Sequence, residues 1–190
     1  LLTRPDTHLP QLKALRKSGV SIRKIPVPNE QKLVSALEGY LCAPVSLKTL
    51  DEMKQSIIYY YQCNGYPIVN ALIPEQNVSD GYLAIYVIIG RLGAVHAEGA
   101  KYFSNEKIAE MIRTKPNEYV RANRMAEDLD WINDNPFRST KLIYEPGSTL
   151  GQADVSLVTE DRFPLKIYGG YQNTGNIIAG SSRYYAGYDW

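Results

Sequence analysis

Between residues 19 and 65 the spacing of apolar side chains predicts one strand followed by two helices. Apolar residues alternate over residues 20–27, which is typical of a strand. After Asn29, a residue type that caps helix N-termini, apolar residues recur at the i, i+3, i+4 and i+7 positions of a helix. The same period resumes near Ser46 and stops at Asn64-Gly65, where glycine favours a helix end.

Two strands complete this unit, and the whole order then repeats. Apolar runs predict strands over residues 68–74 and 82–89, joined by a polar turn that ends in Asp80-Gly81. The second set consists of a strand at 93–98, a helix capped by Ser104, a helix through Met125 and Ile132, and strands at 140–144 and 153–159. The repeated order indicates two tandem β-α-α-β-β units.

The last stretch, residues 164–190, has a different pattern. Apolar and polar residues alternate over residues 165–172 and again over 183–190, after a turn region around residues 173–176. Alternation of this length with many aromatic residues is typical of a transmembrane barrel hairpin, although a soluble hairpin would show the same alternation. Two strands cannot close a barrel, because the smallest bacterial barrels need about eight.

Composition excludes several classes of function. Among 190 residues, 21 Lys+Arg against 20 Asp+Glu leave a net charge of +1, so no basic field favours nucleic acid or anionic lipid. The charged fraction of 22% and the hydrophobic fraction of 44% are typical of a folded chain, and 15 tyrosines favour strands over an all-helical bundle. The longest strongly apolar stretch, residues 82–89, is shorter than the ~20 residues of a membrane helix. No leader pattern opens the chain, so we expect a mature or excised piece.

The two cysteines, Cys42 and Cys63, do not form a disulfide framework. They are expected at the ends of two successive antiparallel helices, which would separate them by on the order of 20 Å. Because the Cα atoms of a disulfide lie within roughly 7 Å of each other, we expect no intramolecular bond between them.

Catalytic chemistry is not supported. The sequence contains no G-x-S-x-G, H-E-x-x-H, C-x-x-C or P-loop motif. The two histidines, His8 and His96, are interpreted as ordinary polar residues. The densest acidic cluster, Glu127, Asp128, Asp130 and Asp134, spreads over several faces of its helix and is interpreted as a solvated surface. We therefore predict no enzyme, no metal site, no cofactor and no small-molecule substrate.

Several motifs, taken in order, resemble those of POTRA domains. In the first unit they are Tyr61-Gln62-Cys63-Asn64-Gly65-Tyr66, Ala71-Leu72-Ile73-Pro74-Glu75-Gln76 and Val87-Ile88-Ile89-Gly90-Arg91; in the second, Asn133-Asp134-Asn135-Pro136-Phe137-Arg138 and Gly151-Gln152-Ala153-Asp154-Val155; after it, Asp161-Arg162-Phe163-Pro164-Leu165 and Tyr171-Gln172-Asn173-Thr174-Gly175. These motifs are most similar to those of two-partner secretion transporters, the TpsB family, which includes hemolysin-activator-like proteins. The two cysteines depart from that pattern.

The resemblance implies an α+β fold of two tandem POTRA domains, each a three-stranded mixed sheet with two helices on one face. The expected boundaries are a tail or linker at 1–18, POTRA 1 at 19–90, POTRA 2 at 91–163, and the start of an outer-membrane β-barrel at 164–190. It further implies protein transport at the Gram-negative outer membrane, with residues 19–163 in the periplasm. The implied partners are an unfolded exoprotein and, through the barrel, the outer membrane.

An edge strand is the expected site of client binding, because its unpaired N–H and C=O groups can pair with an extended polypeptide. In POTRA domains the second strand lies at an edge, which points to Ile68, Val69, Asn70, Ala71 and Leu72. Pro67 and Pro74 bracket this stretch and could instead block pairing. Two other functions stay open: the POTRA region of a barrel-assembly relative, and a soluble POTRA-like scaffold.

Overall fold

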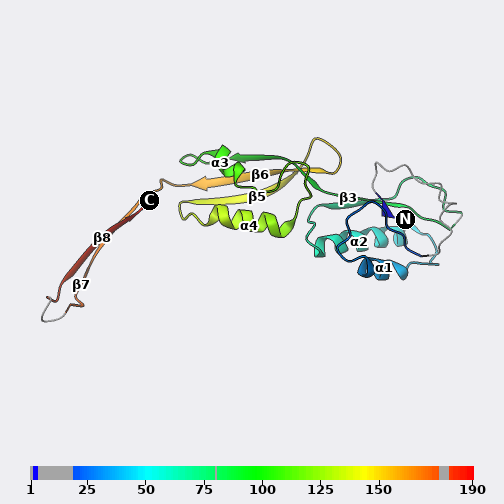
Figure 1. Cartoon of the computed structure of the whole chain (residues 1–190), viewed down its shortest axis with the longest axis horizontal. Coiled ribbons are helices and arrows are strands. Elements are labelled where there is room, and N and C mark those ends of the chain that lie inside the picture. The colour runs from blue at the N-terminus through cyan, green and yellow to red at the C-terminus, as the bar shows by residue number, and fades with distance from the viewer. Residues whose placement is uncertain (1, 4–18, 80, 176–179) are drawn as a thin grey trace.

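The computed structural model describes residues 2–3, 19–79, 81–175 and 180–190. Three parts follow one another along its long axis (Figure 1). We call residues 19–90 with Leu2–Thr3 unit 1, residues 91–163 unit 2, and residues 164–190 the C-terminal hairpin.

Unit 1 packs two helices on a three-stranded sheet. Its elements are β1 (Leu2–Thr3), α1 (Glu30–Glu38), α2 (Leu47–Cys63), β2 (Val69–Leu72) and β3 (Ile85–Ile89). The sheet order is β1-β3-β2, with β1 parallel and β2 antiparallel to β3. The predicted N-cap Asn29 is confirmed, since it accepts from the Lys32 N–H, and α2 is capped by Ser46, which accepts from the Thr49 N–H.

The predicted strand over residues 20–27 is wrong. Within it only Ile22 makes an isolated bridge, while Lys24 has a φ of 56°, which interrupts an extended backbone. Its apolar side chains still pack against the core of unit 1, which explains the alternating pattern. The third strand is instead β1, which belongs to the expected tail; residues 4–18 of that tail lie outside the described residues.

Unit 2 has the predicted order in full. Its elements are β4 (Arg91–Glu98), α3 (Asn105–Glu110), α4 (Ala122–Asn133), β5 (Arg138–Pro146) and β6 (Gln152–Asp161). The sheet order is β4-β6-β5, with β4 parallel and β5 antiparallel to the central strand β6. Ser104 caps α3 as expected.

Each unit has its own core on the helix side of its sheet. In unit 1, Leu33 of α1 and Ile57 and Tyr61 of α2 are fully buried against β3. In unit 2, Ile108 of α3 and Ile132 of α4 are buried in one cluster with residues of β4 and β6. Burial of apolar side chains at this level is worth about 1.5–3 kcal/mol each.

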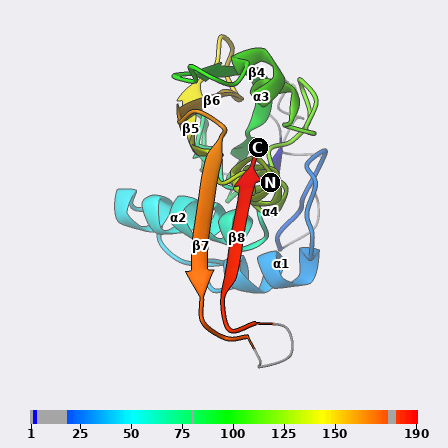
Figure 2. The same cartoon turned by 90° about the vertical axis from the view of Figure 1, so that its left-hand side faces the viewer.

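The C-terminal hairpin stands away from both cores (Figure 1), and its two strands run side by side (Figure 2). It pairs β7 (Lys166–Gln172) with β8 (Arg183–Asp189) in antiparallel register. The register makes one face the more apolar, since it places Ile167 opposite Tyr188 and Tyr171 opposite Tyr184 there. On the other face Lys166 lies opposite Asp189, and Gln172 opposite Arg183.

Candidate functional site: the free edges of the two sheets

The outer edge of β2 carries the residues predicted as the client-binding site. The Gly90 N–H donates to the Ile68 carbonyl oxygen at 2.7 Å, so this pair faces inward. Inward and outward pairs alternate along an antiparallel ladder. The backbone groups of Asn70 and Leu72 therefore also point to β3, and those of Val69 and Ala71 point away from the sheet. Val69 and Ala71 form the free edge of unit 1.

The side chains of the five predicted residues lie in different surroundings. Ala71 is buried on the helix side, and Asn70 and Leu72 are exposed on the opposite face. Ile68 packs against the core of unit 2, so it belongs to the junction between the units.

A second outer edge belongs to β5, which has nine residues. The Arg162 N–H donates to the Phe137 carbonyl oxygen at 2.9 Å, and the Gly147 N–H donates to the Gln152 carbonyl oxygen at 3.1 Å. These bonds fix the alternation at both ends of β5: odd-numbered residues face β6, and even-numbered residues face outward. Thr140, Leu142 and Tyr144 are thus outward-facing residues.

Much of this second edge is already occupied. The Asn133 side chain accepts from the Thr140 N–H at 2.7 Å and donates to the Thr140 carbonyl oxygen at 3.0 Å. The Arg138 N–H donates to the Asn135 carbonyl oxygen, and Pro146 has no N–H. Among the described residues, this leaves Leu142 and Tyr144 as the two positions of β5 whose outward N–H and C=O groups are both free, and we call them the free edge of unit 2.

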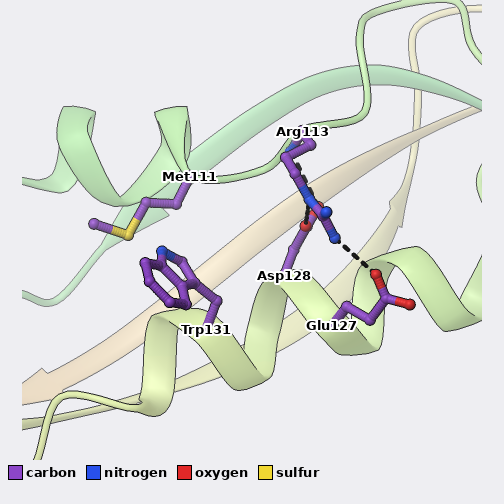
Figure 3. Close-up of a pocket in the computed structure, with 5 residues that line it drawn as sticks. All are labelled: Met111, Arg113, Glu127, Asp128 and Trp131. Carbon is purple, nitrogen blue, oxygen red and sulfur yellow. Dashed lines mark hydrogen bonds and ion pairs between the residues drawn. The ribbon is translucent and has the colours of Figure 1, made fainter.

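The helix that carries Asn133, α4, is tied through its middle to the segment that follows α3. Asp128 is 1% exposed and accepts from the Arg113 backbone N–H and side-chain Nε, while Glu127 pairs with the outer guanidinium nitrogen at 2.9 Å (Figure 3). These hydrogen bonds raise the pKa of Arg113, with Asp128 as the main cause. Arg113, Glu127 and Asp128 together have a structural role, and we call them the clamp of unit 2. A shallow pocket of about 440 Å³ beside it is lined by Met111 and by Trp131, which is 69% exposed.

The connection from α3 to α4 fastens unit 2 to unit 1. The Val120 N–H donates to the Gly90 carbonyl oxygen, and the Ala122 N–H donates to the Gly65 carbonyl oxygen, both at 3.0 Å. The Arg121 guanidinium lies 4.3 Å over the Tyr66 ring. Two backbone hydrogen bonds and one cation–π contact therefore join the two units.

The exit from unit 2 toward the hairpin is also fixed. Asp161 accepts from the backbone N–H groups of Lys101, Tyr102 and Phe103, at 2.7–3.0 Å. Desolvation raises the pKa of Asp161, but these bonds outweigh it and leave the pKa below its usual value. The chain therefore leaves unit 2 from an anchored position.

Sequence reasoning missed two features of the site. The acidic cluster was expected to be a solvated surface, yet Asp128 is buried where Arg113, in the segment after α3, pairs with it. Asn133 begins the POTRA-like motif over residues 133–138, but the neighbouring residues in the sequence do not indicate that its side chain reaches β5. In the described part of the chain no group of three or more metal-ligating side chains comes together. Both cysteines are free and exposed.

Comparison with known proteins defines the class. Residues 15–90 match the family model described as POTRA domain, ShlB-type. Unit 1 is therefore a POTRA domain of this type, and unit 2 repeats its order of elements in the same fold. The resemblance to two-partner secretion transporters is confirmed.

Individual relatives are transporters. The chain is 25% identical over 158 residues to the heme/hemopexin transporter protein HuxB of Haemophilus influenzae, covering 82% of this chain and 28% of HuxB. It is 24% identical over 168 residues to the outer membrane transporter CdiB of Escherichia coli, covering 86% of this chain and 28% of CdiB. The chain is homologous to these transporters, and it spans little more than a quarter of their length.

Solved structures agree on the fold. The structure of CdiB from Escherichia coli matches with a TM-score of 0.70 at 20% identity, over 81% of this chain and 28% of CdiB. POTRA domains 1–3 of Omp85 from Anabaena match with a TM-score of 0.59 at 16% identity, over 74% of this chain and 61% of that chain. No helix among the described residues is long and apolar enough to cross a membrane.

Proposed function

We propose that this chain is the periplasmic client-recognition region of an outer-membrane protein-secretion transporter. It binds an unfolded exoprotein and passes it to the barrel of the full-length protein. The observation that carries the proposal is the free edge of unit 1, where Val69 and Ala71 present outward N–H and C=O groups. An extended client segment can pair with those groups as an added strand, and such binding needs neither a cofactor nor catalysis.

The test uses proline to remove one outward donor at a time. The probe is a fluorescein-labelled peptide of alternating threonine and valine flanked by lysines, called here the strand peptide, and binding is read by fluorescence anisotropy. Val69→Pro and Ala71→Pro each delete an N–H that β3 does not use, so each should weaken binding about fivefold or more. Val69→Thr keeps the N–H and the branched side chain, and it should bind like the wild type.

Unchanged affinity in both proline variants, with folding intact by circular dichroism, would exclude β2 as the client site. The relatives favour secretion over barrel assembly, because the curated transporters HuxB and CdiB match by sequence, whereas Omp85 matches in fold alone.

The hairpin is proposed as the first strand pair of the barrel. Both faces are exposed, and an isolated two-stranded hairpin is at best marginally stable in water, so it needs neighbours. Its apolar face, with Tyr184 81% and Tyr188 73% exposed, suits lipid. On the polar face the Tyr185 ring covers Gly170 and the Tyr168 ring covers Gly187, so a side chain at either glycine would collide with a ring.

Adjacent residues on opposite faces test this assignment in the full-length transporter. With Cys42 and Cys63 replaced by serine, Tyr184→Cys and Tyr185→Cys are each labelled with a fluorophore and reconstituted in vesicles that contain nitroxide-labelled lipids. Quenching at position 184 and little at 185 is expected. Equal quenching at both positions would contradict the assignment of faces.

A further inference from the structure

Asn133 occupies a place on β5 that a neighbouring strand would take. A side-chain amide carries one carbonyl acceptor and an NH2 donor, the same pair of groups as a backbone peptide. Here it bonds both the N–H and the C=O of Thr140, at 2.7 and 3.0 Å, and so completes that residue's hydrogen bonding from the outside. Thr140 itself is only 3% exposed.

We propose that Asn133 is a gate on the free edge of unit 2, which restricts an added strand to Leu142 and Tyr144. This inference rests on the proposed function, since it takes the added strand to be an extended segment of an unfolded polypeptide. An incoming backbone cannot reach Thr140 unless it displaces two formed hydrogen bonds. Asn133 therefore fixes the register in which a client begins to pair with β5.

The same geometry favours an unfolded polypeptide over a second copy of the chain. A second copy would bring a rigid strand of nine residues along the edge, and that strand would meet Asn133. A flexible polypeptide can pair over two residues and then turn away. The exposed side chains of Ile143 and Tyr144, at 46% and 38%, leave apolar surface on both faces beside the pairing position.

Amide hydrogen exchange in the 190-residue chain, resolved by residue with NMR, tests the gate without any variant. Thr140 should be protected in the free chain because Asn133 holds its N–H, whereas Leu142 and Tyr144 should exchange fast. Adding the strand peptide should slow exchange at Leu142 and Tyr144 and leave Thr140 unchanged. Fast exchange at Thr140 in the free chain would overturn the proposal.

Substitution of the gate should increase affinity. Asn133→Ala exposes both groups of Thr140, so the strand peptide should bind about tenfold more tightly. Asn133→Asp still accepts the Thr140 N–H but frees its C=O, so a gain of about threefold is expected; it also serves if the alanine variant does not fold. Asp134→Ala, a change at the exposed neighbour, should bind like the wild type.

The possible failures separate the two proposals. If the strand peptide protects Val69 and Ala71 but neither Leu142 nor Tyr144, client binding at unit 1 stands and the gate is wrong. If Asn133→Ala and Asn133→Asp bind with unchanged affinity, the gate is also wrong. If Asn133→Ala dimerises in sedimentation and its peptide affinity does not rise, Asn133 guards against a second copy and the client assignment is overturned. If no variant binds and exchange is unchanged at both edges, the proposed function itself fails.

Discussion

The edge strands β2 and β5 differ in length, but they offer an almost equal number of free backbone groups. β2 has four residues, of which Val69 and Ala71 face outward. β5 has nine, yet Asn133 covers Thr140 and Pro146 lacks a donor, which leaves Leu142 and Tyr144. A long exposed edge invites aggregation, and short strands or covering groups limit it. On these two edge strands the free backbone is thus limited to two residues each, on β2 by strand length and on β5 by a cap.

The largest expected effect is a loss of stability caused by a change in unit 2. Asp128→Ala removes the buried carboxylate that ties α4 to the segment after α3, and it should lower the free energy of unfolding by about 3 kcal/mol. Because Asn133 lies on the same helix, Thr140 should also lose protection from exchange. Chemical denaturation and NMR measure the two effects.

The matched control for that variant is Glu127→Ala. Glu127 pairs with the same arginine, but both side chains are more than half exposed, at 65% and 56%. Its loss should cost less than about 0.5 kcal/mol, as for most surface ion pairs. Equal losses in the two variants would contradict the assignment of Asp128 as the buried clamp.

A smaller effect is expected in unit 1, from two neighbouring tyrosines. The Tyr60 hydroxyl donates to the Asn29 carbonyl oxygen at 2.7 Å and accepts from the Asn29 N–H at 2.9 Å, so Tyr60→Phe should cost about 1–2 kcal/mol of stability. The Tyr61 hydroxyl is buried and has no hydrogen-bond partner among the residues that the structure describes, and burial raises its pKa. Tyr61→Phe should therefore leave the free energy of unfolding unchanged or raise it. A loss at Tyr61 as large as that at Tyr60 would show that its hydroxyl is satisfied.

The smallest effect is expected on peptide affinity, from a substitution that lengthens the free edge of unit 2. Pro146 lies in an outward position, so Pro146→Val adds one free donor to β5 and should strengthen binding of the strand peptide about fivefold. Pro74 lies just beyond β2, at a position whose backbone would face inward if the strand continued. Pro74→Val should therefore leave affinity unchanged. A gain for Pro74→Val alone would place binding on the edge of unit 1.

The sequence predicts most elements because their causes are local. Helix period, the caps at Asn29, Ser46 and Ser104, and the glycine end at Gly65 are properties of short windows. The error at residues 20–27 has the same origin. Their alternating side chains reach the core, but strand pairing depends on a partner, and the left-handed backbone at Lys24 breaks it.

The candidate site was only half predictable. The position of β2 at an edge follows from the resemblance, and Pro67 and Pro74 mark its limits. The capping of β5 depends on a contact between the end of α4 and the third residue of β5. That contact depends on how α4 packs in unit 2, which the pair of Asp128 with Arg113 in the segment after α3 helps to fix. Local patterns hold no information on it.

The junction between the units has a consequence for cooperativity. Ile68 of unit 1 packs into the core of unit 2, and Tyr119 of unit 2 packs against the core of unit 1. Each core is therefore incomplete without its neighbour, and a cut between Gly90 and Arg91 would expose an apolar side chain on both pieces. The two units should melt together as a single thermodynamic block, so that a polypeptide bound to either one stabilises both.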